Sequence, residues 1–276
     1  MRYYRIIQAF RASCYDELNA LKPGNVHCFA GGHGMEVIHF EDAADAAAPH
    51  IATEHARVGA RIEAAVKASV AKTGLNINLG IILLCAPLAA AYETGGPLRE
   101  ALAATLAALD IEDAAATFRA ITLANPGGLG QAEQHDVHAP PAVGLREAMG
   151  AAASRDRIAR QYVSDFADVF EIGVARVNVL RQAAAPVKAE AVHLAFMAAF
   201  PDSHIARKFG PEVAAGVRAE AEAIERAVDW KAPDARRRIP LAEFDASLKE
   251  RGLNPGTSAD LTVASLFAAR LLALTA

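Results

Sequence analysis

The sequence has 276 residues, 53% of them hydrophobic and only 6% aromatic, so it can bury a large core and favours helices over strands. Its formal net charge of −4 and isoelectric point near 6.1 argue against nucleic-acid binding, which normally requires a basic excess. The composition therefore predicts a mostly α-helical protein that binds no nucleic acid, with small molecules as its partners.

The cysteines and the N-terminus indicate the compartment. Cys14, Cys28 and Cys85 are an odd number without CxxC spacing, which suggests neither a disulfide framework nor a zinc site. The N-terminal residues contain no extended apolar core followed by a small-residue cleavage site, so they do not resemble a signal peptide. We therefore expect a cytoplasmic protein with reduced thiols, no export signal and no membrane span.

The first segment, residues 3–20, is predicted to be a helix that ends in a fixed loop. Its apolar face is formed by Tyr4, Ile7, Phe10, Cys14 and Leu18. The residue before a proline avoids helical geometry and a glycine accepts positive φ, so Lys22-Pro23-Gly24 begins a loop that continues to residue 27. A second glycine-rich turn follows at residues 31–36. Two polar turns so close together favour a ligand-lining segment, although two ordinary helix-linking turns fit these residues equally well.

Two helices are predicted next, at residues 41–56 and 57–72. The first is alanine-rich and has acidic residues at its front, where the helix dipole favours negative charge. The second has a clear apolar stripe, formed by Val58, Ile62, Val66 and Val70. It runs into Thr73-Gly74, so a helix–loop–helix joint is expected there.

The most distinctive stretch is residues 73–91, in which a polar, turn-prone entry precedes the most apolar run of the chain. We expect Asn78 to be the N-cap of a helix, its side-chain oxygen accepting a backbone N–H. The remaining N–H groups and the helix dipole would receive a phosphate or a carboxylate. The run is shorter than the roughly twenty residues that cross a bilayer, and Pro87 interrupts it. A buried central helix with a ligand site at its mouth is therefore predicted.

Helices at residues 97–108 and 111–123 lead to the longest irregular stretch, residues 124–141. Long loops inside compact domains tend to be functional or disordered. This loop carries four candidate donors or ligands, namely Glu133, His135, Asp136 and His138. Because their spacing matches no known helical ligand pair, a lid or an inter-subunit contact is favoured over metal binding.

Further helices are predicted at residues 145–170, 174–182 and 187–200, the last of which belongs either to the core or to a dimer surface. The segment from Pro201 to Pro211 is a candidate for anion binding, because Arg and Lys supply donors to phosphate. A charged helix-linking turn fits this segment equally well. Its polar residues are Asp202, Ser203, His204, Arg207 and Lys208.

The C-terminal part is predicted to contain helices at residues 212–229 and within residues 252–267. The short basic run Arg236–Arg238 is isolated and is expected to be a solvated surface. A Pro-Gly turn opens the last helix, and Asp260 is expected in its first turn. With no repeat and no linker composition, residues 1–276 are predicted to form one all-α domain, a multi-helix bundle around a buried central helix.

Four segments carry a family resemblance when they are taken together and in order. They are Leu21-Lys22-Pro23-Gly24, Gly31-Gly32-His33, Thr73-Gly74-Leu75-Asn76-Ile77-Asn78-Leu79-Gly80 and Pro255-Gly256-Thr257-Ser258-Ala259-Asp260-Leu261. They resemble the Pro-Lys-Pro-Gly loop, the Gly-x-His turn, the Thr-Gly-Gly-Val-Asn-Thr-His-Lys-Gly signature and the final Pro-Gly-x-x-Ala-Asp-Leu of the triphosphoribosyl-dephospho-CoA synthase family. The resemblance spans most of the chain. It implies an all-α fold that uses ATP and dephospho-CoA to build a prosthetic-group precursor and releases adenine.

Two departures separate the chain from that pattern. Asn78 and Leu79 replace the histidine and lysine of the signature, which removes a charged contact to a triphosphate or to the departing base. Glu36 stands one step further from His33 than the acidic residue of the family does. The chain thus resembles a divergent branch that is associated with the synthesis of one-carbon carrier cofactors, such as pterin or furan cofactors.

The resemblance implies a glycosyl transfer in which Mg²⁺ holds the triphosphate of ATP. Such a reaction is helped by a carboxylate near the sugar and a donor near the base. Asp260 and Glu36 are expected as Mg²⁺ ligands or as the acceptor-activating base, and His33 as a further catalytic residue. The expected nucleotide contacts are Lys22, Gly24, Asn25, Thr73, Gly74, Asn76, Asn78, Gly80, Asp202, His204, Arg207, Lys208, Pro255, Gly256 and Thr257. We expect these turns to converge on one pocket.

Two other functions are compatible with the same residues. An ATP-dependent ligase or phosphotransferase of cofactor assembly would release ADP or AMP instead of adenine. A non-catalytic homologue would bind the nucleotide and form no product. A homodimer is an open possibility in each case, and helix capping alone would also account for each Gly and Asn.

Overall fold

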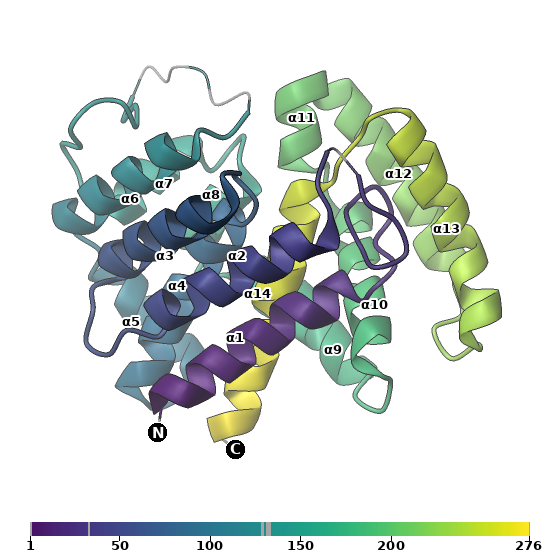
Figure 1. Cartoon of the computed structure of the whole chain (residues 1–276), viewed down its shortest axis with the longest axis horizontal. Helices are drawn as coiled ribbons and strands as arrows, with labels where there is room; N and C mark the ends of the chain where they lie inside the picture. Colours follow the sequence, from purple (N-terminus) through teal and green to yellow (C-terminus); the bar gives the residue numbers. More distant parts are fainter. Residues whose placement is uncertain (1, 33, 128–129, 131–133, 276) are drawn as a thin grey trace.

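The computed structural model describes residues 2–32, 34–127, 130 and 134–275, and the regular structure of this part of the chain is helical (Figure 1). The prediction of an all-α fold is confirmed. The helices are α1 (Arg2–Leu18), α2 (Val37–Ile51), α3 (Val58–Thr73), α4 (Leu79–Thr94), α5 (Leu98–Ala107), α6 (Ile111–Ala124), α7 (Leu145–Ala152), α8 (Arg157–Val163), the π-helix η1 (Val169–Val174), α9 (Ala175–Val179), α10 (Ala185–Ala199), α11 (Ser203–Phe209), α12 (Pro211–Ala227), α13 (Asp234–Glu250) and α14 (Gly256–Thr275).

Two helices that are apolar on every side occupy the centre. Nearly all residues of α4 are buried, and α14 packs against α4, α1, α10 and η1. A helix without a polar face is stable only when it is surrounded. In Figure 1, α2 to α8 lie on one side of α14 and α10 to α13 lie on the other. The predicted buried central helix therefore exists, and α14 shares its position.

Pro87 lies inside α4, so the prediction that it interrupts the apolar run is wrong. A proline has no N–H to offer the carbonyl four residues earlier, here that of Leu83. The hydroxyl of Tyr162 donates a hydrogen bond to that carbonyl at 2.6 Å instead. A buried tyrosine of α8 thus replaces the missing backbone donor and allows the helix to continue.

The N-terminal helices differ from the predictions in detail. The buried face of α1 contains Ile6, Phe10, Cys14 and Leu18, but Tyr4 is 70% exposed, because it lies on the outer face of the helix while its neighbour Tyr3 packs against the core. The next helix, α2, begins and ends several residues earlier than predicted. The turn that precedes its start is closed by two backbone hydrogen bonds between Gly32 and Met35.

The predicted continuous helix at residues 145–170 is wrong, because this stretch forms α7, α8 and the start of η1. Asp156 accepts hydrogen bonds from the N–H groups of Ile158 and Ala159 at 2.9 and 3.0 Å, and so begins a new helix. Asp165 and Phe166 have positive φ values, which no α-helix accommodates. Apolar periodicity runs through these breaks, since Tyr162 and Phe166 are both buried.

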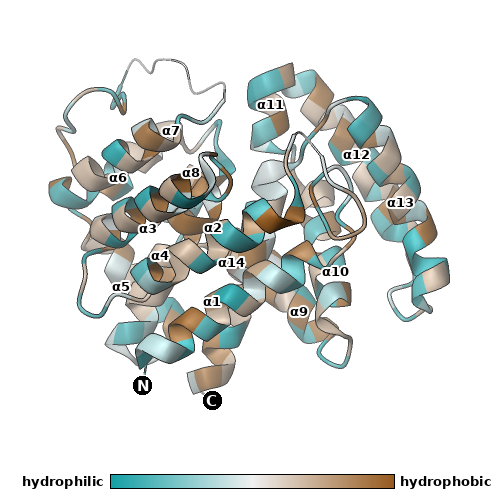
Figure 2. Cartoon of the chain, in the orientation of Figure 1, coloured by the Kyte–Doolittle hydropathy of each residue, from teal (hydrophilic) through white to brown (hydrophobic). Residues whose placement is uncertain are grey.

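A second, smaller core lies between α10, α12 and α13, and Figure 2 shows hydrophilic residues along α12 and α13. The residues of α10 are mostly buried, so this helix belongs to the core and not to an exposed surface. Arg237 is also buried, which contradicts the prediction of a solvated basic run. Its guanidinium binds Glu190 of α10 at 2.8 Å, and Arg238 binds the same carboxylate at 2.7 Å. A buried cation requires such a partner.

Among the described helices, no single one is long and apolar enough to cross a membrane. The pair α4 and α5 together reaches the length and composition of a span, but it is bent by 113°, and α4 is buried in the protein.

Candidate active site

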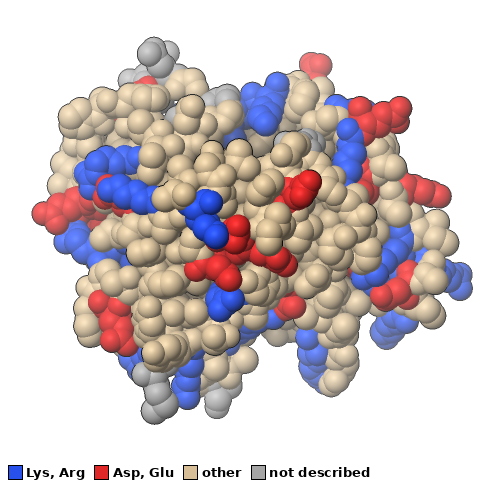
Figure 3. All heavy atoms as spheres, in the orientation of Figure 1, with Lys and Arg blue, Asp and Glu red and all other residues tan. Residues whose placement is uncertain are grey.

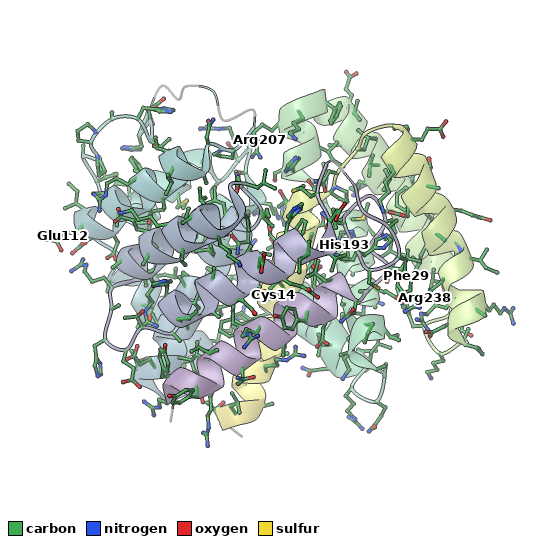
Figure 4. The ribbon with its side chains drawn as sticks, viewed as in Figure 1. Cys14, Phe29, Glu112, His193, Arg207 and Arg238 are labelled. Carbon is green, nitrogen blue, oxygen red and sulfur yellow. The ribbon has the colours of Figure 1, made fainter. Side chains whose placement is uncertain are left out.

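A cavity of about 980 Å³ lies where the two sides of the molecule meet. Its wall is formed by the start of α4, the end of α6 with the loop that follows, α7, α8, α11 and the start of α14. Arg207 of α11 belongs to this wall, and Figure 4 shows its side chain between the ribbons of the two sides. A cavity of this size accommodates a ligand as large as a nucleotide.

The carboxylate of Asp260 lies at the N-terminal end of α4, in the cavity wall. It approaches Gly80 so closely that a Cβ at this position would overlap it, and would also lie 2.7 Å from Ile158. The helix mouth thus holds an acidic side chain of the protein itself, where the sequence predicted a ligand anion. Asp260 lies in the second turn of α14, one turn later than expected.

The surroundings of Asp260 disfavour its charged form. Burial, followed by the neighbouring charges of Glu17, Asp202 and Asp156, raises the pKa of Asp260 well above its ordinary value. Lys22 opposes this effect only weakly. The carboxylate makes no hydrogen bond with the described residues, so its oxygens remain available to a ligand.

A buried chain of polar residues lies beside Asp260. Glu17 of α1 lines the cavity and forms an ion pair with Lys22, whose side chain is completely buried. The ammonium of Lys22 also donates to Asn25 at 3.0 Å, and Asn25 donates to Asn254 at 2.8 Å. Lys22, expected as a phosphate contact, thus lies behind the wall and holds residues that reach the cavity.

The loops before α2 and before α14 are joined behind the same wall. Gly24 has a φ of +78°, and a Cβ there would lie 2.8 Å from Pro255 and 2.9 Å from the carbonyl oxygen of Leu253. Its N–H donates to Asp245 of α13 at 2.8 Å. Gly24 and Pro255, both expected as nucleotide contacts, instead hold two parts of the wall together, since neither lines the cavity.

Asp202, another expected nucleotide contact, has its acceptor oxygens occupied. One oxygen caps α11 by accepting from the N–H groups of His204 and Ile205, and the other accepts from the N–H and the hydroxyl of Ser258, both at 2.8 Å. It therefore ties the start of α11 to the start of α14. Burial raises the pKa of Asp202, whereas these hydrogen bonds lower it.

His204 and the residues that face it belong to the cavity wall. A Cβ at Gly256 would lie 2.9 Å from Nδ1 of His204, so only glycine lets this ring pack against α14. Both residues line the cavity together with Thr257. These three predicted residues are therefore brought together, and their contact with a nucleotide stays a prediction.

Basic side chains from α8, the residue pair before it and α11 also line the cavity and form what we call its basic rim. They are Arg155, Arg157, Arg160, Arg207 and Lys208. Arg207 donates to the carbonyl of Gly127 at 3.0 Å, and Arg157 is paired with Asp168. The side chains of Arg160 and Lys208 form no ion pair with described residues, so they are free to bind an anion. Figure 3 shows positive charge gathered on the surface next to α11.

The signature at residues 73–80 closes one helix and starts the next. The hydroxyl of Thr73 donates to the carbonyl of Ser69 at 2.9 Å, and Gly74, with a φ of +70°, ends α3. Asn76 and Gly80 line the cavity, whereas Thr73 and Gly74 do not.

Asn78 precedes α4 as predicted, but the prediction that its side chain caps the helix is wrong. Its Oδ1 accepts a hydrogen bond from the hydroxyl of Ser69 at 2.8 Å, because the side chain is buried against α3. Leu79 does line the cavity and presents an apolar side chain there.

The turn at residues 31–36 was expected to supply catalytic residues and Mg²⁺ ligands, and of these Glu36 does not line the cavity. Glu36 is exposed at the start of α2, and its N–H donates to Nδ1 of His39 at 3.1 Å. Met35 and Phe40 line the cavity, and Glu36 does not. His33 lies outside the described residues, so its catalytic role stays a prediction.

The loop at residues 124–141 reaches the cavity from the side of α6. Its described residues Asn125, Gly127, Gln134, His135 and Asp136 form part of the wall. Glu133 lies outside the described residues. In the described parts of the chain, no three His, Cys, Asp or Glu side chains gather as metal ligands would.

Sequence reasoning missed several residues of the wall. Glu17 lies in a helix whose apolar face alone was considered, and Asn254 lies one residue before the recognised Pro-Gly turn. Arg155 and Arg160 lie within the predicted helix at residues 145–170, which has no motif that marks them. The only available signal was a glutamate on the buried stripe of α1, four residues from Ser13 and three from Cys14.

Comparisons with known proteins agree with this geometry. A family model described as ATP:dephospho-CoA triphosphoribosyl transferase matches residues 3–276. A crystal structure of an Archaeoglobus fulgidus protein, provisionally assigned as a triphosphoribosyl-dephospho-CoA synthase, is similar to this chain with 27% identity and a TM-score of 0.64. The match covers 83% of this chain and 97% of that chain. No curated protein matches.

Proposed function

The chain belongs to the ATP:dephospho-CoA triphosphoribosyl transferase family, and we propose that the cavity is where it transfers the triphosphoribosyl group of ATP to dephospho-CoA or a related cofactor precursor. The family match makes the protein a transferase with ATP as a substrate. The placement of the two substrates, the residue roles and the choice of acceptor are our proposals.

The observation that carries the proposal is that basic and acidic side chains line one cavity. Arg160, Arg207 and Lys208 line it together with Glu17 and Asp260. Asp156, 3.6 Å from Arg207, is a further carboxylate of the lining. A triphosphate is strongly anionic and is stabilised by Arg and Lys donors. The ribose that carries it would then extend from the basic rim toward the carboxylates of Glu17 and Asp260.

This orientation suits glycosyl transfer. The bond between C1′ of the ribose and the adenine nitrogen breaks with its electron pair on the base, and positive charge develops at the ribose. A carboxylate that is already fixed in a water-poor wall stabilises such charge without reorganisation. We assign this role to Asp260, which Gly80 admits to the cavity wall.

The same carboxylate fits a nucleotide-bound Mg²⁺. Mg²⁺ in nucleotide sites is typically held by one or two carboxylates, substrate phosphates and waters, so a cluster of three protein ligands is not required. Asp260 has oxygens without hydrogen-bond partners among the described residues and lies among other acids, as expected beside a cation. Bound Mg²⁺ would neutralise charge on the triphosphate. Glu36 is a weaker candidate, because it does not line the cavity.

The choice of acceptor is the part of the proposal that the two departures from the family signature, Asn78 and Leu79, affect most. Leu79 lines the cavity with an apolar side chain, and Asn78 is turned away toward Ser69. A cavity with this wall favours an acceptor that is less anionic near α4. A pterin or furan precursor of a one-carbon carrier is therefore the second acceptor class to test beside dephospho-CoA.

Our proposals on cellular location and assembly rest on fewer observations. The three cysteines are free thiols, which supports a reducing compartment such as the cytoplasm. A homodimer has no support from α10, since this helix is in the core.

The test is a product analysis with the purified protein, ATP, Mg²⁺ and each acceptor in turn. Free adenine, with an acceptor whose mass increases by the triphosphoribosyl group, is the expected result. ADP or AMP would contradict the proposal and support a ligase or phosphotransferase. Binding of ATP without a product from any acceptor would support a non-catalytic homologue.

A further inference from the structure

We propose that Glu17 is the general base of the transfer, taking the proton from the acceptor hydroxyl that attacks C1′ of ATP, and that Lys22 positions it. This inference rests on the proposed function and adds a residue that lies outside the four segments compared above. It follows from a buried ion pair of which one member reaches the cavity.

Glu17 is presented to the cavity by a rigid element. It lies on the buried side of α1 near the end of the helix, and only about 3% of it is exposed. One carboxylate oxygen is paired with Lys22. The other makes no hydrogen bond with the described residues, and the side chain lines the cavity. One oxygen is thus anchored and one is available.

Lys22 holds that carboxylate from behind the wall and does not itself line the cavity. Its side chain has no exposed surface, and its second contact is Asn25, which Asn254 holds in turn. A buried ammonium without a carboxylate would be very costly, so the pair is kept together. Lys22 therefore fixes the position of Glu17 without contacting substrate.

The two carboxylates of the wall have different surroundings, which separates their roles. Glu17 has a cation in contact, whereas Asp260 is surrounded mainly by other acids. Pairs of carboxylates in unlike environments commonly divide the work of one active site. Burial raises the pKa of Glu17 above its ordinary value, and Lys22 opposes this, so the carboxylate is more basic than usual.

The step balances without any further reactant. The acceptor O–H bond breaks and its proton goes to the free oxygen of Glu17, while the acceptor oxygen forms a bond to C1′. The bond from C1′ to the adenine nitrogen breaks, and its electron pair stays on the base. Adenine takes up a proton from solvent, and Glu17 later returns its proton to solvent.

The test compares Glu17→Gln with Glu225→Gln, using ATP, Mg²⁺ and dephospho-CoA. Glu225 of α12 is a suitable control because it is also largely buried and ion-paired, to Arg176, yet it does not line the cavity. We expect E17Q to bind ATP as the unmodified protein does and to lose at least about 100-fold in turnover, which is the usual contribution of a general base. E225Q should retain full turnover.

Rescue by a small carboxylate separates chemistry from a structural effect. In Glu17→Ala, added formate can fill the space beside Lys22 and accept the proton, so turnover should rise with formate concentration. E17Q, which keeps the space filled, should not respond. Loss of turnover in E17A with folding and ATP binding intact and no response to formate would overturn the assignment.

A third variant covers the case in which E17Q or E17A does not fold. Glu17→Asp keeps the charge beside Lys22 but withdraws the carboxylate from the cavity, and it should lose most of its turnover. Full turnover in E17D or in E17Q would refute the proposal. Failure of the unmodified protein to release adenine would instead refute the proposed function, so the two failures are distinguishable.

Discussion

At the scale of single residues, Gly80 is the position where the fold and the site constrain each other most directly. A Cβ at Gly80 would overlap the carboxylate of Asp260. We expect Gly80→Ala to lower the free energy of unfolding by about 1–3 kcal/mol, as overpacking in a core typically does. It should also reduce adenine release, because Asp260 must move.

The matched control is Gly216→Ala in α12, where a Cβ would meet no atom within 4 Å. This change should raise the free energy of unfolding by about 0.5–1 kcal/mol, because alanine is the better helix former. Denaturant titration of both variants measures the contrast. Equal stability of G80A and the unmodified protein would show that the wall has room that the structure does not indicate.

The buried side chain of His193 is expected to make the free energy of unfolding depend on pH. Burial, with a smaller contribution from Lys22, lowers the pKa of His193 from 6.5 to about 3. Below pH 6.5 the unfolded chain therefore binds a proton at this position that the folded chain does not bind, so the free energy of unfolding falls as pH decreases toward 3. Over pH 7 to 4 this single group contributes a loss on the order of 3 kcal/mol.

The measurement is unfolding at several pH values for the unmodified protein and for His193→Gln. Glutamine does not titrate, and its amide can donate to the carbonyl of Pro23 as the ring does. The pH dependence should be shallower in H193Q, whereas other groups contribute equally to both proteins and cancel. Parallel curves would mean that His193 is protonated in the folded state.

Sequence reasoning found residues that line the cavity where a motif marked a turn, and missed those whose place in the wall depends on packing. Asn76, Arg207 and Asp260 are in or next to recognisable turns and do line the cavity. Gly24 and Asp202 have equally distinctive surroundings in sequence, yet they join elements behind the wall. A turn motif indicates that backbone is constrained, but only the packed structure tells which side of the turn meets the cavity.

At the scale of elements, α4 depends on a hydrogen bond supplied by α8. Because Pro87 has no N–H, the buried carbonyl of Leu83 relies on the hydroxyl of Tyr162. We expect Tyr162→Phe to lower the free energy of unfolding by about 1–3 kcal/mol, the usual cost of leaving a buried acceptor unpaired. In a Pro87→Ala background the new backbone N–H can replace the hydroxyl, so the same change should cost less.

A double-mutant cycle of these two substitutions tests this coupling. Tyr92→Phe is the control, because Tyr92 is buried and its hydroxyl makes no hydrogen bond with the described residues. An equal cost of Y162F with and without P87A would contradict the replacement of the backbone donor by the tyrosine.

Helix prediction succeeded where caps and periodicity agree, as in α3 with its valine stripe and its closing Gly74. It failed in residues 145–170, where apolar spacing continues across a new cap and two residues of positive φ. It also gave no helix for α13, which contains Pro240 and has few periodic apolar residues. The spacing of apolar residues along the sequence does not show where the tertiary structure ends one helix and begins the next.

At the scale of the whole molecule, the cavity is lined by elements from both sides of α14. A bound nucleotide would therefore contact α8 and α11 at once and couple the two sides. We expect ATP with Mg²⁺ to slow amide hydrogen exchange at the start of α4, in α8, in α11 and at the start of α14. Exchange in α5 and α13, which do not line the cavity, should not change.

Slower exchange confined to one side would contradict the proposed placement of the triphosphate, since the basic residues that would bind it lie in α8 on one side and in α11 on the other. The same experiment with E17Q serves as a control for the binding step, because this variant is expected to bind ATP normally.

The junction of the first and last loops also has a consequence for how the protein is made. Asn25 and Asn254 are 229 positions apart, and Gly24 and Asp245 are 221 apart, yet both pairs are hydrogen-bonded. Contacts of such long sequence separation form slowly, because a large loop must close before they contribute. During synthesis, α1 to α8 can pack as they emerge, whereas the carboxylate wall must wait for α14 to leave the ribosome. Nucleotide binding by nascent chains should therefore appear late and abruptly.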